Sequence, residues 1–245
     1  MTALDDLAAI AFHDADSAQR ARMLSRLADT ELSVALVAEP EGDRIELRIF
    51  PLDGGPVALA CDGEDRLAGF FGAPVAYAAM PGRVLAGLLR QEGVGLLVNP
   101  GHPSEMLLDA GMLDWLTGVL SAAPETAEAR LRLTAPSPAT IEALAEPLAA
   151  RLADMRGLIT GAALAGVRGE DGPKAHLLLI AGAEAGHQPA IAKALAEALA
   201  FLPPQPGGVD ISFSDAAPPP AALRFELSPP EPSPAERAKA PPRLR

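Results

Sequence analysis

Residues 93–108 read GVGLLVNPGHPSEMLL, and they decide how the first half of the chain folds. The apolar run before Asn99 is short and predicts a buried strand. It stops at Asn99, Pro100 and Gly101, three residue types that are typical of a tight turn. After a polar break, a second apolar run leads into a helix around Trp115. The segment therefore predicts a strand and a helix, separated by a rigid turn.

Two segments upstream show the same passage from strand to helix. Residues 56–71, PVALACDGEDRLAGFF, and residues 75–89, VAYAAMPGRVLAGLL, each place a short apolar run before a helical pattern. The second of these helices carries the apolar residues Val84, Leu85, Leu88 and Leu89.

A helix and a hairpin are predicted before these segments. Residues 17–30 carry apolar residues at helical spacing. In the run at 44–50, Ile45, Leu47 and Ile49 alternate with charged residues, which predicts a half-buried hairpin strand with those three side chains inward. A hairpin followed by strand–helix alternation predicts a mixed sheet with helices packed on it.

Taken in order, the three strand-to-helix segments resemble the N-terminal domain of the SseB family, named for enhanced serine sensitivity. The resemblance implies the fold of that domain for residues 1–122. Asn99, Pro100 and Gly101 match the family's pattern. The resemblance implies no reaction, because the family has no established one to carry over.

The second half predicts a separate domain. Prolines around a charged stretch at 123–138 indicate a linker, and residues 139–228 have the helix, hairpin, helix and strand order of a small α+β domain. This order is similar to the C-terminal domain of SseB proteins. Pro147 leaves open one helix or two short pieces. Residues 229–245, rich in Pro, Glu, Ser, Ala and Arg, predict a disordered tail.

The fold class is therefore α+β, a mixed α/β arrangement of two small domains, each a mixed sheet covered by helices. Charge and cysteine content then limit the partners. The chain has 20 Lys and Arg against 32 Asp and Glu, a formal net charge of −12. Without a basic face we expect no binding to nucleic acid, and the negative charge disfavours an anionic membrane surface. The single cysteine, Cys61, and an acidic N-terminus unlike a secretory signal favour the cytoplasm.

The candidate binding site is the loop that carries Asn99, Pro100, Gly101, His102 and Ser104. Ligands often sit at the carboxyl ends of strands in α/β layers, and these side chains supply donors and acceptors. The alternative is a rigid turn without a ligand, and this structural role is favoured. On that interpretation Asn99→Ala lowers stability, whereas His102→Ala and Ser104→Ala leave it nearly unchanged.

Other candidates for chemistry have structural explanations. Cys61 is predicted to be an inert buried thiol, because the neighbouring charge of Asp62 opposes thiolate formation. Asp62 is predicted to cap the following helix, and Glu64 and Asp65 to complement its dipole. The histidines, which lack partners at metal-ligand spacing, are His13, His102, His176 and His187. We therefore expect no catalytic residue, no metal site and no cofactor.

Three functions follow from these observations. The first is a non-enzymatic cytosolic protein that acts by binding another, unknown protein. The second is a small-molecule sensor or enzyme that uses a cleft near Asn99. The third is a secretion-system component, because the name SseB is also attached to a translocon subunit. The sequence disfavours the third, since it lacks the amphipathic helices and heptads of such a subunit. It leaves the oligomeric state open.

Overall fold

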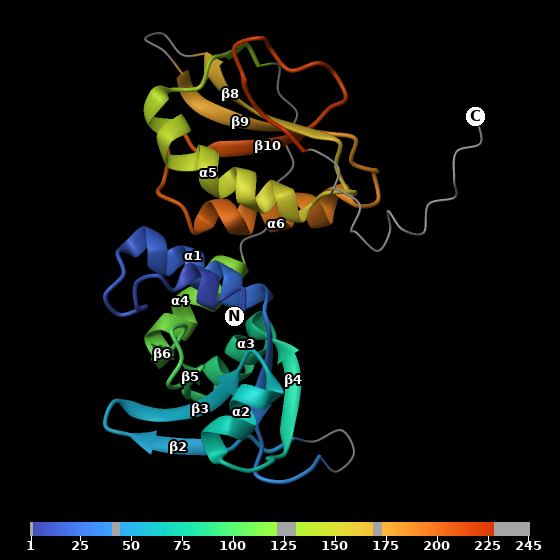
Figure 1. Cartoon of the computed structure of the whole chain (residues 1–245). Coiled ribbons are helices and arrows are strands. Elements are labelled where there is room, and N and C mark those ends of the chain that lie inside the picture. The colour runs from blue at the N-terminus through green and yellow to red at the C-terminus, as the bar shows by residue number, and fades with distance from the viewer. Residues whose placement is uncertain (1, 41–44, 122–130, 169–172, 228–245) are drawn as a thin grey trace, which may run out of the picture. The chain divides into compact units, whose positions relative to one another are not determined.

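The computed structural model describes residues 2–40, 45–121, 131–168 and 173–227 (Figure 1). The chain divides into two compact units, Met1–Ala123 with Ala200–Pro203 and Pro124–Leu199 with Pro204–Arg245. Each unit contains a mixed sheet with helices packed on it, so the predicted α+β class is confirmed. Residues 123–130 of the predicted linker and the predicted disordered tail, 229–245, lie outside the described residues.

The first unit is built on a six-stranded sheet of order β4-β1-β3-β5-β6, in which β2 also pairs with β3. Strands β3 and β5 are parallel, and the other pairs are antiparallel. In chain order the elements are η1 (Asp5–Leu7), α1 (Ser17–Asp29), β1 (Glu31–Ala35), β2 (Ile49–Leu52), β3 (Gly55–Cys61), α2 (Glu64–Phe71), β4 (Tyr77–Pro81), α3 (Gly82–Glu92), β5 (Gly95–Val98), β6 (Met106–Leu108) and α4 (Ala110–Leu120).

Helices cover both faces of this sheet, because successive side chains of a strand point to opposite faces. On β3, Ala58 and Ala60 pack into a large core with α1, α3 and α4, whereas Leu59 and Cys61 pack into a smaller core with Leu67 of α2. Figure 1 shows α1, α3 and α4 on one side of the sheet and α2 on the other. The single helix α2 leaves part of its face uncovered, where β1 and β4 lie.

Local signals explain several helix starts. Asp109 caps α4, because its side chain accepts the N–H of Met112. The prediction that Asp62 caps α2 is wrong, because the N-cap residue is Gly63 and the helix has no side-chain cap. Asp62 instead forms an ion pair with Arg66, four residues further along the chain.

Only two of the four apolar residues named for helix α3 face the core. Leu85 and Leu89 are buried, but Val84 and Leu88 are 47% and 41% exposed. Gly82 accounts for this orientation, because a Cβ there would lie 2.1 Å from the carbonyl oxygen of Leu27. The helix packs against α1 through this bare backbone, which turns Val84 and Leu88 outward.

The hairpin strand is less buried than its alternation predicts. Leu47 packs against the large core, but Ile45 and Ile49 are each 41% exposed. On the opposite face, Arg48 lies 5.4 Å above the ring of Phe71. The face predicted to point inward is therefore only partly buried.

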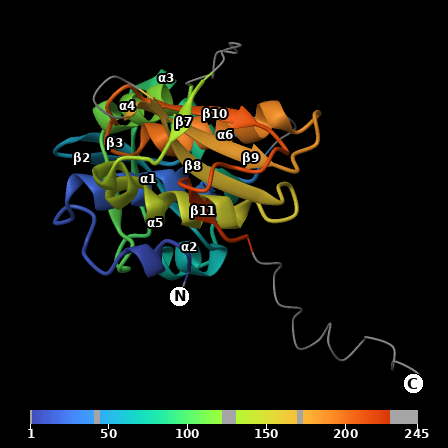
Figure 2. The same cartoon turned by 90° about the horizontal axis from the view of Figure 1, so that it is seen from above.

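The second unit has a five-stranded sheet of order β10-β9-β8-β11, with β7 paired to β8. Figure 2 shows β10, β9, β8 and β11 side by side, and Figure 1 shows both helices on one side of them. The elements are β7 (Leu133–Thr134), α5 (Pro138–Asp154), β8 (Gly161–Arg168), β9 (Pro173–Ala181), α6 (Gln188–Ala200), β10 (Val209–Phe213) and β11 (Leu223–Phe225).

Two features of this unit bear on the sequence predictions. Leu133–Thr134, inside the predicted linker, pair with β8 and so form part of the sheet. Helix α5 begins at Ser137, whose side chain accepts the N–H of Thr140, and continues as one helix through Pro147. Within the described ranges, no helix combines the length and the apolar character needed to cross a membrane.

Candidate binding site at the carboxyl ends of β3 and β5

The parallel pairing of β3 and β5 brings their carboxyl ends together. Ala60 lies opposite Val98, and the N–H of Asn99 donates to the carbonyl of Ala60 at 3.0 Å. Asp62 and Asn99, which follow these strands, therefore meet at one edge of the sheet. This is the edge where ligands bind in many open α/β sheets.

Asn99 is held in an unusual conformation by the bonds of its side chain. Its φ of 47° makes it the one non-glycine residue with a positive φ in the described part of the chain, and it is fully buried. The Oδ1 atom accepts the N–H of Asp62 at 2.9 Å, and Nδ2 donates to the Ser104 hydroxyl at 2.9 Å. Asparagine tolerates this left-handed region better than most residues do.

Ser104 extends the network to the N-terminal segment. Its hydroxyl donates to Oδ1 of Asp5 at 2.6 Å. The guanidinium of Arg66 also pairs with Asp5, and its Nη1 lies 3.0 Å from Oδ1 of Asp62. The side chains of Asp5, Asp62 and Arg66 are only 5%, 2% and 17% exposed. A buried polar cluster thus joins η1, the start of α2 and the loop after β5.

The charges of the cluster stabilise one another. The Arg66 guanidinium, aided by the Ser104 hydroxyl, holds the pKa of the Asp5 carboxyl well below its usual range, although burial opposes this shift. Asp5 and Asp62 also raise the pKa of Arg66. One atom is left over: Oδ2 of Asp62 is buried and has no hydrogen-bond partner within the described residues.

Cys61 precedes this cluster and is a fully buried free thiol, as predicted. Burial, together with the charge of Asp62, raises the pKa of the Cys61 thiol to about 11. Only the thiolate is a good nucleophile, and this raised pKa leaves little thiolate at neutral pH.

The predicted site residues serve different purposes in the loop. Asn99 and Ser104 are buried and bonded to each other. The N–H of Gly101 donates to the carboxylate of Glu105 at 2.6 Å, and the N–H of His102 donates to the carbonyl of Asn99 at 3.1 Å. Pro100 lies within this closed turn. The bonds inside the loop are those that a structural role requires, and Ser104 is more important to them than the sequence suggested.

Asp5 and Arg66 were not predicted as site residues. Asp5 is 99 residues from Ser104 and 61 from Arg66, so no local pattern connects them. The spacing of Asp62 and Arg66 was a usable signal, because residues four apart on a helix are neighbours.

The histidines lie apart from this cluster, except for His102. Nε2 of His13 accepts the N–H of Leu107, at the free edge of β6. His176 is buried on β9, its Nε2 accepts the N–H of Ser137, and burial lowers its pKa. Nδ1 of His187 lies 3.8 Å from Oε2 of Glu184. Among the described residues, no three His, Cys, Asp or Glu side chains are grouped to hold a metal ion.

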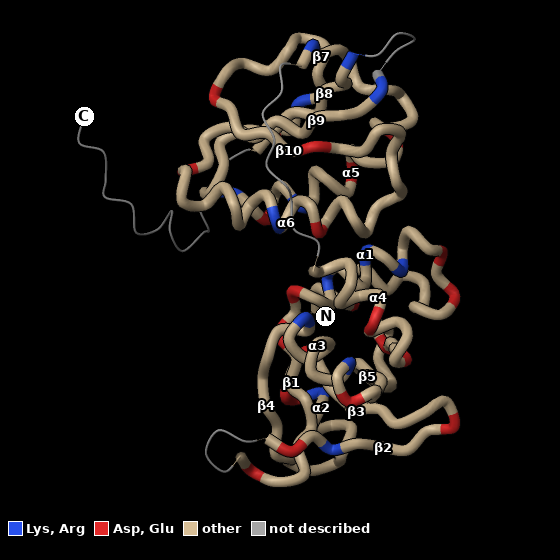
Figure 3. The backbone as a smooth tube through the Cα atoms, turned by 180° about the vertical axis from the view of Figure 1, so that it is seen from behind, with Lys and Arg blue, Asp and Glu red and all other residues tan. Residues whose placement is uncertain are grey.

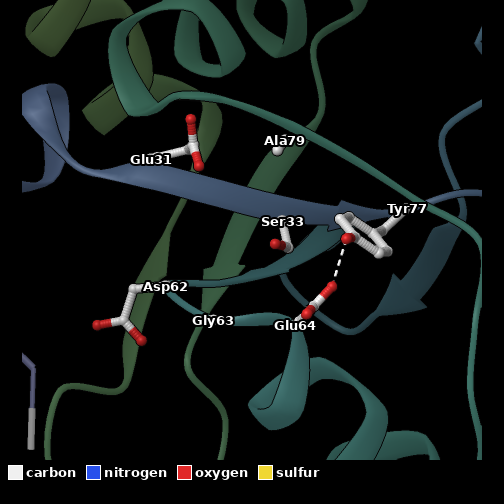
Figure 4. Close-up of a pocket in the computed structure, with 7 residues that line it drawn as sticks. All are labelled: Glu31, Ser33, Asp62, Gly63, Glu64, Tyr77 and Ala79. Atoms are coloured by element: carbon white, nitrogen blue, oxygen red, sulfur yellow. Dashed lines mark hydrogen bonds between the residues drawn. The ribbon is translucent and has the colours of Figure 1, made fainter.

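A pocket of about 300 Å³ lies beside the network (Figure 4). Asp62 belongs to both, but no residue of the 99–104 loop lines the pocket. The lining residues are Glu31, Ser33, Asp62, Gly63, Glu64, Tyr77 and Ala79. The open space at this edge therefore faces the exposed part of β1 and β4, and not the predicted loop.

Residues 5–115 match the family described as SseB protein N-terminal domain. The matched residues make up most of the first unit, which is therefore an SseB N-terminal domain. The match contains the whole Asp5, Asp62, Arg66, Asn99 and Ser104 cluster. It ends before the second unit, whose resemblance to the SseB C-terminal domain stays a prediction. No curated protein and no solved structure matches the chain.

We expect Asn99→Ala to destabilise the first unit by about 2–4 kcal/mol, because two buried partners lose their bonds and Ala is strained at positive φ. Asn99→Gly removes the same bonds without the strain and should cost about 1 kcal/mol less. Urea unfolding followed by the fluorescence of Trp115, the one tryptophan, measures both.

The bonds of Ser104 change the expectation for its substitution, and the same unfolding measurement tests the new one. Ser104→Ala should now cost about 1–3 kcal/mol, whereas His102→Ala should stay within about 0.5 kcal/mol of the wild type. Equal stability of the Asn99→Ala, Ser104→Ala and wild-type proteins would contradict the structural role of the network.

The low pKa of Asp5 predicts a pH dependence. A carboxyl whose pKa is lower in the folded than in the unfolded chain, where it is about 3.9, stabilises the fold above that value and loses the effect as pH falls below it. The stability difference between wild type and Asp5→Asn should therefore be largest near neutral pH and shrink below about pH 4. The exposed Asp14→Asn serves as the control. A difference that does not change with pH would show that the carboxylate of Asp5 is not paired in solution.

Proposed function

We propose that this protein is a non-enzymatic binding protein that acts in the cytoplasm through contact with another protein. The observation that carries the proposal is the state of the polar groups at the sheet edge. The side chains of Asn99, Ser104 and Asp5 are bonded to one another in the interior of the unit. Catalysis needs such groups to point together at a bound substrate, whereas here they are hydrogen-bonded to one another.

The chemistry of Cys61 supports the same conclusion. A nucleophilic thiol needs a low pKa and access to substrate, and this thiol has a raised pKa and is fully buried. A single cysteine is also in keeping with a reducing compartment.

The pocket beside Asp62 favours a second candidate, a sensor of a small molecule. Its volume of about 300 Å³ is at the lower end of small-molecule sites. Its lining is mostly polar, however, whereas small-molecule sites are mostly apolar. The pocket is therefore better suited to a single side chain of a partner. No particular observation favours a secretion-system role.

The test is capture of partners with the purified full chain, followed by reconstitution. We expect a protein that binds at a fixed stoichiometry when both components are pure. Native mass spectrometry of the freshly isolated chain is the parallel measurement. A metabolite retained at full occupancy, or one that the chain converts to product, would contradict the proposal.

A further inference from the structure

The pocket lies on the part of the first sheet that α2 leaves uncovered. Glu31 and Ser33 of β1 and Tyr77 and Ala79 of β4 are on one face, since Ser33 pairs with Ala79 and side chains alternate along a strand. On the other face Leu32 and Val34 are fully buried in the large core. The four residues thus form a floor, and the chain from Asp62 to Glu64 forms a wall (Figure 4).

The pocket is negatively charged and has no basic lining residue. Of its three carboxylates, Asp62 pairs with Arg66, and Glu64 accepts a hydrogen bond from the hydroxyl of Tyr77. Glu31 has no ion-pair partner within the described residues. Over residues 1–123 the chain carries 18 Asp and Glu against 8 Arg and no Lys, and Figure 3 shows the acidic and basic positions interspersed along the backbone.

The same carboxylates act on Tyr77. Its hydrogen bond to Glu64 and the charges of Glu64, Glu31 and Glu39 raise the pKa of Tyr77 above its ordinary value. A cation placed among these groups would be attracted by the same charges.

Ser33 provides a second observation that points to a ligand. It is 8% exposed and lines the pocket, yet its hydroxyl has no hydrogen-bond partner in the described part of the chain. The hydroxyl opens onto the pocket, where it is free to donate to or accept from a group that enters. Figure 4 shows the Ser33 side chain between those of Glu31 and Glu64. A donor from a ligand that lies between the two carboxylates would reach this hydroxyl.

We infer that this pocket binds the guanidinium group of an arginine side chain from a protein partner, between Glu31 and Glu64 and above Ser33. The inference rests on the proposed function and names the chemistry of the contact. The acidic groups of the described residues are not arranged to hold a metal ion. A guanidinium suits them, because its planar fork of five donors reaches separate acceptors at once. The Tyr77 ring, part of the pocket floor, adds an aromatic group against which the guanidinium can stack.

The test is a titration of the ¹⁵N-labelled full chain with the peptide acetyl-Gly-Arg-Gly-amide. We expect saturable shifts at Ser33, Glu64 and Tyr77 with a Kd on the order of 1 mM. The same peptide with citrulline, a neutral isostere of arginine, should not saturate. Equal binding of the citrulline or lysine peptide would overturn the choice of guanidinium.

Paired variants locate the contact. Glu31→Gln with Glu64→Gln should weaken the arginine peptide about tenfold or more, whereas Glu92→Gln, an exposed residue of α3, should leave its affinity unchanged. Circular dichroism before titration confirms that each variant is folded. Undiminished affinity in the double variant would overturn the inference, and the proposed function would still stand on partner capture by the full chain.

A further titration distinguishes the source of the guanidinium. Free L-arginine should bind no more tightly than the peptide, because the pocket accommodates one side chain. Free L-arginine that binds about tenfold more tightly than the peptide would overturn the assignment to a protein partner and favour the small-molecule candidate.

Discussion

The side chain of Asn99 connects parts of the first unit that are far apart in sequence. One end of its amide accepts the N–H of Asp62, 37 residues earlier, and the other donates to Ser104 in its own loop. Ser104 in turn bonds to Asp5 in the N-terminal segment. Because these groups are buried, removing the partner of any one of them lowers the stability of the unit by more than the loss of a hydrogen bond at the surface would. The backbone of the loop and the placement of the N-terminal segment therefore both depend on this amide.

The hydrogen bonds around Asn99 determine which part of the first unit has open space for a partner. Two parallel strands end at the cluster, and in many α/β folds such an edge receives a ligand. Here the edge is filled by the carboxylate of Asp5 and the guanidinium of Arg66, so the open surface is displaced toward β1 and β4. Among the described residues, the carboxylate of Glu31 and the hydroxyl of Ser33 on that surface have no partner. The proposed contact with a basic partner follows from this displacement.

The elements of the fold were predictable where the signals are local. Asp109 and Ser137 each cap a helix through a residue three positions away, and the strands around residues 56–61 and 95–98 are short apolar runs. The orientation of α3 was not predictable from its apolar stripe, because it depends on the contact of Gly82 with α1. The site was predictable only in part. The turn at Asn99 is visible in the sequence, whereas its partner cluster includes Asp5, which only the folded sheet brings close.

Hydrogen exchange at the amide of Asp62 measures whether the Asn99 side chain holds this edge of the sheet. This N–H ends a strand and would exchange quickly, were it not for its bond to Oδ1 of Asn99. We expect slow exchange in the wild type, comparable with that of the Asn99 amide, which bonds to the Ala60 carbonyl. In Asn99→Ala, protection should be lost at residue 62 and kept at residue 99. Fast exchange of the Asp62 amide in the wild-type protein would contradict the claim that the Asn99 side chain holds this edge of the sheet together.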